Sequence, residues 1–169
     1  MKSALPKVMH SLAGKPLVQH VVDTAKKLDS EHQVHLVVGH GAERVIEHFS
    51  ESSVSIVEQT EQLGTGHAVA QALPYVKSDS ISLVLYGDVP LIQQTSLTAL
   101  IKQVSDQSMA LLTAIPESSS GYGRIVRNEH NKVLAIVEEK DASEQQKTIS
   151  EINTGILAVQ SRKLHQWLP

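Results

Sequence analysis

The sequence predicts an α/β protein with a doubly wound sheet, and three features of the chain indicate this fold class. Short apolar runs that are typical of buried strands alternate with segments whose apolar residues recur at the helical period. The connections between them are short, which favours right-handed crossovers between parallel strands. The 169 residues are 41% hydrophobic, enough for a single core. We therefore expect one domain with a mixed, mostly parallel sheet and helices on both faces.

The expected elements follow from periodicity and from the residues that interrupt it. A 3.6-residue apolar stripe with Pro16 in its first turn is typical of a helix, and GTGHAVAQAL opens with glycines and stops before Pro74. VHLVV is typical of a buried strand, and SISLVL is typical of a strand buried on both faces. In chain order we expect a helix at 16–28, a strand at 34–38, a helix at 43–49, a strand at 54–57, a helix at 64–73, a strand at 80–85, a helix at 94–104, a strand at 109–115, a strand at 155–159 and a helix at 161–167.

A hairpin is expected between the last two of these strands. SSSGYGRIV and VLAIVEE are β-type runs, and the polar turn Asn131-Lys132 separates them. The hairpin would be an addition to the doubly wound core.

The start of the chain departs from this architecture. A doubly wound sheet ordinarily begins with a strand, a glycine-rich turn and a helix, whereas Pro6 and Gly14 interrupt the 15 residues before the first helix. We therefore expect the first strand and its glycine-rich loop to be lacking. That strand would lie between 34–38 and 80–85, so these two strands would have to pair with each other or with another molecule.

Composition excludes several classes of function. A net charge of −3 with intermixed signs and an aromatic content of 3% argue against a nucleic-acid partner. No tract is long and apolar enough for a membrane span, the start lacks a signal peptide, and cysteine is absent, so we expect a cytoplasmic protein. The histidine pairs His32/His35 and His40/His48 do not share a helical face, and we expect solvated histidines rather than metal ligands.

The stretch LYGDVPLI ends the predicted strand at 80–85 and places Asp88 at its carboxyl end. Ligands bind at this edge in open α/β sheets. A turn cap is the simpler interpretation of Gly-Asp before Val-Pro, and these residues alone favour it.

Four stretches together resemble one family of enzymes. They are LPKVMHSLAGKPLVQHVV, EQTEQLGTGHAV, LYGDVPLI, and SGYGRIVR with VEEKDA and EINTGI. In order and spacing they are similar to the uridyltransferase half of the bacterial bifunctional N-acetylglucosamine-1-phosphate uridyltransferase/glucosamine-1-phosphate acetyltransferase. The resemblance implies a Rossmann-like nucleotidyltransferase domain, here partial over 1–169, without the β-helix acetyltransferase domain through which the family forms a homotrimer.

The resemblance also implies a reaction and a metal ion. UTP and N-acetylglucosamine 1-phosphate would give UDP-N-acetylglucosamine and pyrophosphate, with a sugar-phosphate oxygen attacking the α-phosphorus in line. Asp88 matches the aspartate that binds Mg²⁺ in the family, and Lys7 matches a lysine that meets the phosphates. With the family in view, the ligand-binding interpretation of Asp88 replaces the turn cap.

The substrate-binding residues implied by the resemblance form two groups. The first reads the uracil and lines the nucleotide, and it comprises Gln59, Gly64, Thr65, Tyr86, Gly87 and Asp88. The second contacts the sugar and its N-acetyl group, and it comprises Gly123, Glu138 and Asn153, with Thr154 adjacent. Read alone, Thr65 would be a helix N-cap. We expect Arg124 to be structural.

Three parts of the family's site have no counterpart in these residues: the glycine-rich phosphate cradle, its arginine, and a second metal ligand, an asparagine. We therefore expect the chain alone to be impaired or inactive. Two alternatives remain open, a non-catalytic module that binds a uridine nucleotide weakly and a different sugar-1-phosphate nucleotidyltransferase.

Overall fold

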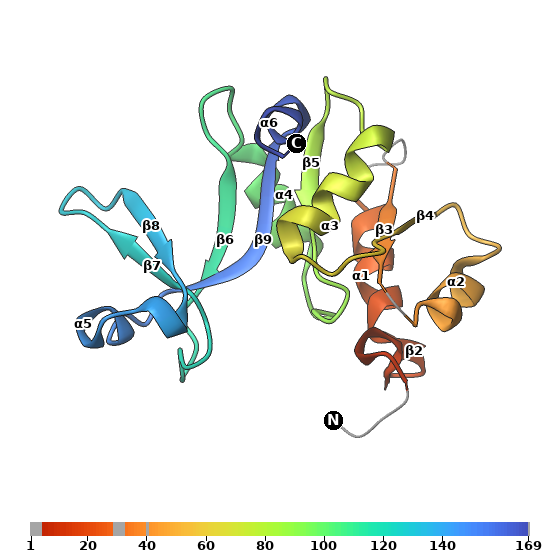
Figure 1. The fold of residues 1–169 in the computed structure, drawn as a ribbon, viewed down its shortest axis with the longest axis horizontal. Helices are drawn as coiled ribbons and strands as arrows, with labels where there is room; N and C mark the ends of the chain where they lie inside the picture. Colours follow the sequence, from red (N-terminus) through yellow and green to blue (C-terminus); the bar gives the residue numbers. More distant parts are fainter. Residues whose placement is uncertain (1–4, 29–32, 40, 169) are drawn as a thin grey trace.

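The computed structural model describes residues 5–28, 33–39 and 41–168. Figure 1 shows a central sheet, a group of helices and two strands on its right, and a hairpin with short helices on its left. The helices are α1 (Leu17–Lys26), α2 (Glu43–Phe49), α3 (Thr65–Ala72), α4 (Gln94–Lys102), α5 (Glu144–Lys147) and α6 (Ser161–Trp167), with single turns η1 (Lys7–Met9), η2 (Leu73–Tyr75) and η3 (Glu139–Asp141). The strands are β1 (Ser11–Leu12), β2 (Lys15–Pro16), β3 (His35–Val38), β4 (Ser55–Glu58), β5 (Ile81–Val84), β6 (Ala110–Ala114), β7 (Arg124–Arg127), β8 (Val133–Val137) and β9 (Ile152–Gln160).

A two-stranded parallel sheet forms the first half of the fold. β3 and β4 pair in register from His35 opposite Ser55 to Val38 opposite Glu58. Helices α1 and α2 cover this pair through a core that consists of Val18, Val22, Val38, Val45, Phe49 and Val54. The crossover from β3 through α2 to β4 is the unit that the alternating pattern predicts.

The second sheet has five strands and is built around β9. β5 and β6 both pair with β9 in antiparallel register, β7 joins β9 at Arg124 opposite Ile152, and β8 pairs with β7. Every pair in this sheet is antiparallel, whereas β3 and β4 are parallel. The described strands thus form both kinds of pair, as expected, but the expected predominance of parallel pairs is wrong. The reason is that the chain returns from the hairpin directly into β9, which lies between two strands of the opposite direction.

Helices cover both faces of β9, as the sequence predicts. Ile156 and Ala158 pack with Leu97 and Leu100 of α4. Val159 packs with Leu73 and with Leu164 of α6 in a separate cluster that α3 also joins. Because successive side chains of a strand point to opposite faces, these two clusters lie on opposite sides of the sheet.

β3 and β5 each have a single hydrogen-bonded neighbour among the described strands, β4 and β9 respectively, and they do not pair with each other. Direct pairing, one of the two outcomes expected for them, is thus not found. Val38 is the one fully buried residue of β3, and β5 has none. The expected burial of 80–85 on both faces is wrong, because a strand at a sheet edge keeps part of its surface in water.

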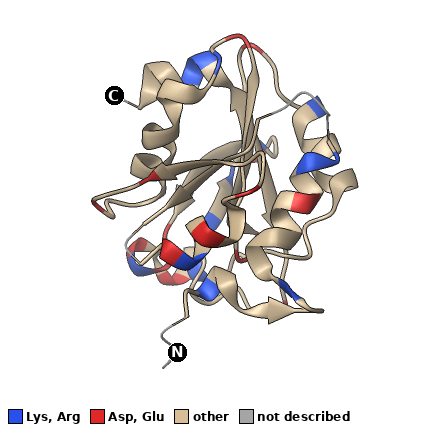
Figure 2. Ribbon diagram, turned by 90° about the vertical axis from the view of Figure 1, so that its right-hand side faces the viewer, with Lys and Arg blue, Asp and Glu red and all other residues tan. Residues whose placement is uncertain are grey.

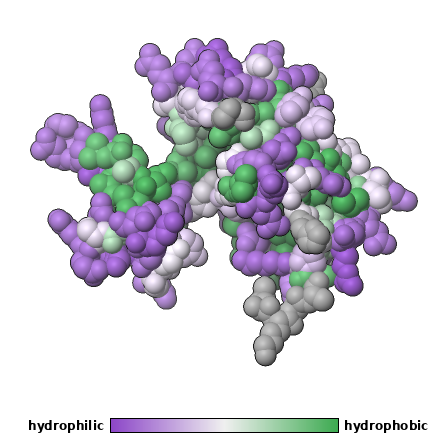
Figure 3. Space-filling view, in the orientation of Figure 1, coloured by the Kyte–Doolittle hydropathy of each residue, from purple (hydrophilic) through white to green (hydrophobic). Residues whose placement is uncertain are grey.

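The hairpin β7–β8 carries apolar surface. Val133, Leu134 and Ile136 are 48%, 64% and 42% exposed, and Figure 3 shows hydrophobic residues gathered on this part of the molecule. Lysine and arginine are intermixed with aspartate and glutamate on the face drawn in Figure 2. Within the described residues, no helix is long and apolar enough to cross a membrane.

His35 differs from the solvated histidines that we expected. Its Nδ1 atom is buried and has no hydrogen-bond partner within the described part of the chain. Its ring stacks on that of Tyr75, with the two ring centroids 6.1 Å apart. Burial lowers the pKa of His35. His48 is exposed, as expected, whereas His32 and His40 lie outside the described residues.

Candidate nucleotide site

The segment after β5 brings Asp88 to the edge of the sheet. Tyr86, Gly87 and Asp88 follow Val84, where β5 ends. A Cβ atom at Gly87 would lie 3.2 Å from Val8 Cγ1 and 3.3 Å from a methyl carbon of α1. Glycine thus lets the segment pass close to η1 and α1, which places Asp88 beside the first turn of the chain.

Lys7 and Asp88, the two residues predicted to be catalytic, are in contact. Lys7 Nζ lies 2.6 Å from Asp88 Oδ2, across 81 positions of sequence. The side chains are 63% and 29% exposed, and the hydrogen bond with Asp88 raises the pKa of Lys7. The ammonium group therefore stays charged at the strand end, where it is accessible to an anionic ligand.

Asp88 is the carboxylate that would hold Mg²⁺ in this arrangement. No cluster of three or more His, Cys, Asp or Glu side chains suited to a metal occurs among the described residues. Magnesium is commonly held by one or two carboxylates together with substrate phosphates and water. The partly exposed carboxylate of Asp88 fits that mode of binding, in which the nucleotide supplies the remaining oxygens.

Gln59, Gly64 and Thr65 lie together at the start of α3. The N–H of Gln59 donates to Val38 O at 2.7 Å and so continues the ladder of β3 and β4. Its side-chain Nε2 donates to Gly64 O at 3.3 Å. Gly64, not Thr65, is the N-cap of α3, and it has a φ of 101° that favours glycine. The N-cap alternative for Thr65 is therefore wrong.

Tyr86 lies between the residues predicted to read the uracil and the second predicted group. Its hydroxyl oxygen lies 3.4 Å from Thr65 Oγ1. A Cβ atom at Gly155, which has a φ of 76°, would lie 2.5 Å from the same hydroxyl oxygen. Only glycine is compatible with both the backbone conformation and the position of the tyrosine ring.

Gly155 is not one of the predicted residues, but it links Tyr86 to the second group. Its N–H donates to Asn153 Oδ1 at 2.8 Å, and the N–H of Asn153 donates to Gly123 O at 2.8 Å. A Cβ atom at Gly123 would lie 3.2 Å from Glu138 Oε1. Gly123, Glu138 and Asn153 are therefore brought together, and Tyr86 joins them to the nucleotide group.

Thr154 differs from its neighbours in this group. Its hydroxyl donates to Leu112 O of β6 at 2.5 Å and accepts from the N–H of Ile156 at 3.2 Å. The hydroxyl is thus bound to backbone groups, so the structure supports a role for Thr154 in holding β9 rather than in contacting a ligand directly.

Glu139 is a residue of this region that the sequence did not indicate. Its Oε2 atom forms an ion pair of 2.7 Å with Arg124, whose side chain is 2% exposed, and accepts from the N–H of Gly121 at 3.2 Å. The hydrogen bond with Arg124 lowers the pKa of Glu139. Arg124 also donates to the carbonyl oxygens of Tyr122 and Ile149, which agrees with its expected structural role.

The comparisons with known proteins agree with this arrangement. Residues 1–153 match the family model of the MobA-like NTP transferase domain. The chain belongs to this family. It is also 56% identical over 169 residues to the bifunctional protein GlmU of Cellvibrio japonicus and 55% identical to that of Marinobacter nauticus. The resemblance drawn from the sequence is thereby confirmed, and the chain spans 37% of the length of these relatives.

Solved structures show that the NTP transferase fold is shared more widely. UDP-glucose pyrophosphorylase complexed with UDP-glucose superposes with a TM-score of 0.72 at 18% identity, covering 95% of this chain and 70% of that one. The inositol-1-phosphate CTP transferase from T. maritima superposes with a TM-score of 0.71 at 19% identity, covering 99% of this chain and 66% of that one. At these identities the similarity shows the Rossmann-like α/β fold alone.

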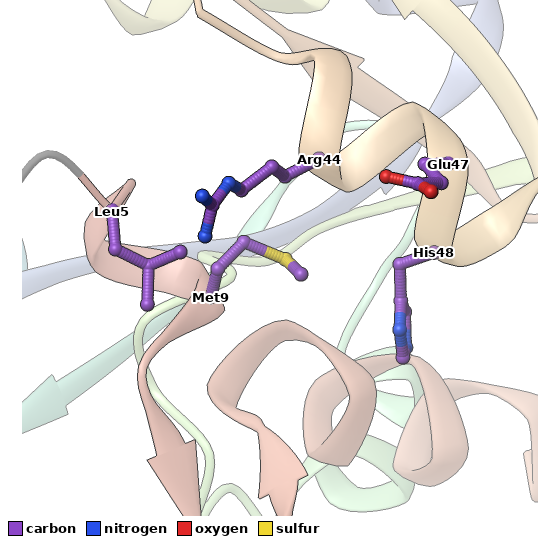
Figure 4. A pocket seen from close by; sticks show the side chains of 5 residues that line it. All are labelled: Leu5, Met9, Arg44, Glu47 and His48. Carbon is purple, nitrogen blue, oxygen red and sulfur yellow. The ribbon is translucent and has the colours of Figure 1, made fainter.

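An open pocket on the NTP transferase domain lies apart from these residues. It has a volume of about 490 Å³ and is lined by Leu5, Met9, Arg44, Glu47 and His48. Figure 4 shows Arg44, Glu47 and His48 on one helix, facing Leu5 and Met9. None of the predicted site residues lines this pocket, so it does not define the nucleotide site.

Proposed function

We propose that this NTP transferase domain transfers a uridylyl group from UTP to N-acetylglucosamine 1-phosphate. UDP-N-acetylglucosamine and pyrophosphate are the products. The observation that carries the proposal is the contact between Lys7 and Asp88 at the carboxyl end of β5. Contacts through Tyr86 lead from the residues expected at the base to those expected at the sugar. The similarity to the two GlmU proteins supports the same reaction.

The chemistry requires two anionic substrates to approach each other. A phosphate oxygen of the sugar phosphate attacks the α-phosphorus of UTP, and the bond to the β-phosphate breaks to release pyrophosphate. Lys7 would neutralise phosphate charge with its ammonium group, and Asp88 would hold Mg²⁺. When bound, Mg²⁺ supplies further charge neutralisation and polarises the phosphoryl oxygens.

The sugar half would bind through groups that suit hydroxyls and an N-acetyl group. Glu138 provides carboxylate oxygens, and Asn153 provides an amide nitrogen that makes no hydrogen bond within the described residues. Gly123 lets Glu138 approach the backbone closely. We keep the homotrimer implied by the resemblance as a prediction for a longer protein of this family.

A second candidate is a sugar-1-phosphate nucleotidyltransferase with a different base or sugar. The observation that favours it is the range of proteins with the same fold, which includes UDP-glucose pyrophosphorylase and the inositol-1-phosphate CTP transferase from T. maritima. The first experiment below separates the two candidates.

Calorimetric titration of the chain with UTP, CTP, dTTP and ATP, with and without Mg²⁺, tests the proposal. We expect UTP to bind most tightly and Mg²⁺ to strengthen its binding about tenfold or more. Subsequent titration with N-acetylglucosamine 1-phosphate and glucose 1-phosphate should favour the acetylated sugar. Tighter binding of another nucleotide, or no preference for the N-acetyl group, would support the second candidate.

Asp88→Asn should abolish the effect of Mg²⁺ because it removes the charge that holds the cation. Asp106→Asn is a matched control, since Asp106 forms an equally short ion pair of 2.6 Å with Arg162 on the surface. Its effect on nucleotide binding should be negligible. An unchanged response to Mg²⁺ in Asp88→Asn would contradict the proposal.

A further inference from the structure

The amide group of Gln59 is held by two neighbours, and these determine what it can offer to a base. Its Nε2 atom lies 3.3 Å from Gly64 O and 2.9 Å from His67 Nδ1. A backbone carbonyl can only accept, so the Gln59 atom beside it is the NH₂ nitrogen, and the second hydrogen of that group is available to His67. The carbonyl oxygen Oε1 is then the atom of Gln59 left for a ligand.

These contacts also determine the tautomer of His67. A neutral imidazole accepts at one ring nitrogen and donates at the other. Because Nδ1 accepts from Gln59, the proton lies on Nε2, which is 3.3 Å from the Gln71 side-chain atom placed as the nitrogen Nε2. Two donors do not bond, so the Gln71 amide must accept through its oxygen. Gln71 is one helical turn beyond His67 in α3, and the helix therefore supports the whole series of bonds.

We propose that His67 is a positioning residue that sets the base specificity of the site. The inference rests on the proposed function, because it assumes that Gln59 meets the base. By accepting the Gln59 amide hydrogen, His67 keeps Oε1 turned toward the ligand. An oxygen there favours a pyrimidine whose ring nitrogen N3 carries a proton, as in uracil. Cytosine presents a lone pair at N3, and two acceptors facing each other repel.

Substitution of His67 separates positioning from a purely structural role. His67→Leu removes the acceptor and puts an apolar side chain of moderate size in its place. Only the longer bond of 3.3 Å to Gly64 O then restrains the Gln59 amide, so a larger share of molecules can present its NH₂ group to the base, which suits cytosine. His67→Asn restores an acceptor, since the asparagine Oδ1 atom can occupy the place of Nδ1. His130→Leu is the matched control, because His130 is 74% exposed beside Glu129 in the β7–β8 turn.

The measured quantity is the ratio of the dissociation constants for CTP and UTP in the presence of Mg²⁺. We expect this ratio to fall about three- to tenfold in His67→Leu, the effect of one hydrogen bond, and to recover in His67→Asn. The control should keep the ratio of the unsubstituted chain. A ratio unchanged in His67→Leu overturns the inference while leaving the proposed function intact, whereas equal binding of UTP and CTP by the unsubstituted chain overturns both.

A second measurement does not require a nucleotide or a variant. Long-range ¹H–¹⁵N spectra of the histidine-labelled chain distinguish the two neutral tautomers of His67. We expect the proton on Nε2 and an unprotonated Nδ1 at neutral pH. A proton on Nδ1 would overturn the inference even if the variants fail to fold, because His67 would then be unable to accept from Gln59.

Discussion

Two ion pairs of similar length lie in different parts of the site, and they contrast in their surroundings. Lys7 and Asp88 approach to 2.6 Å with side chains 63% and 29% exposed. Arg124 and Glu139 approach to 2.7 Å, but the arginine is only 2% exposed. The first pair joins η1 to the segment after β5, whereas the second joins the first residue of β7 to η3.

The contrast in exposure has an energetic consequence. Opening an exposed pair costs little, since water solvates both charges. Breaking a pair around a buried arginine leaves a charge without compensation. In the proposed function, Lys7 would leave Asp88 for a phosphate group, and Asp88 would leave Lys7 for a cation. Arg124 and Glu139 instead hold the backbone around Gly123 in place.

The largest expected effect is the loss of stability in Arg124→Met. Arg124 is buried and also satisfies two backbone carbonyls, so its removal leaves those acceptors unpaired. We expect a loss of about 3 kcal/mol in the free energy of unfolding, measured by urea denaturation. Arg127→Met is the matched control, since Arg127 pairs with Glu151 while 31% exposed; its loss of stability should be clearly smaller, because water solvates the exposed pair. Equal losses would remove the contrast between buried and exposed pairs.

Gly155→Ala tests the connection between the two regions. The substitution forces an alanine to a φ of 76° and against the Tyr86 ring. Gly14→Ala is matched in backbone conformation, with a φ of 82°, but has no atom within 4 Å of the added carbon. We expect about 1 kcal/mol of destabilisation in Gly14→Ala and about 2 kcal/mol in Gly155→Ala. Similar thermal midpoints in both variants would contradict the close contact with Tyr86.

The two ion pairs should lose their contributions at opposite ends of the pH range. The pKa of Glu139 is lowered, so its contribution to stability is present above the ordinary value of 4.5 and is lost as pH falls through the lower folded value. The pKa of Lys7 is raised, so its contribution is present below 10.5 and is lost as pH rises through the higher folded value. Thermal melts across pH should show a weaker acid dependence in Glu139→Gln and a weaker alkaline dependence in Lys7→Met. A change at the other end of the range in either variant would contradict these assignments.

The smallest expected effect on stability is that of Asp88→Asn. Asp88 is partly exposed and its partner is mostly in water, so we expect a change of about 0.5 kcal/mol or less in urea denaturation. Raising the salt concentration should change the free energy of unfolding of the unsubstituted chain little more than it changes that of the variant. A loss as large as that in Arg124→Met would mean that the Lys7–Asp88 pair is structural, which would weaken its proposed role in binding.

Much of the local structure could be predicted from the residues. The helix expected at 64–73 is found at Thr65–Ala72, and the strand expected at 34–38 is found at His35–Val38. Asp88 lies at the end of a strand, as LYGDVPLI indicated. Periodicity and helix-breaking residues act within a few positions of the chain, so a single sequence carries this information.

The partners of those elements were not predictable in the same way. The position of β9 between β5 and β6 depends on the return of the chain from the hairpin, over about forty residues that carry no local signal of strand direction. Likewise Glu138 and Glu139 are adjacent and chemically identical, and only the fold determines that one approaches Gly123 while the other pairs with Arg124.

The sequence by itself thus determined the longer helices and strands of the core, their order and the chemical groups available at the strand ends, because these depend on local periodicity and residue type. It did not indicate β1, β2 or α5. The tertiary structure alone decided which groups meet: Lys7 with Asp88 across 81 positions, and Gln59 with His67 across a turn. It also decided which charges are buried. The physical reason is that exposure and hydrogen bonding depend on atoms brought close by packing, and residue type does not specify its neighbours.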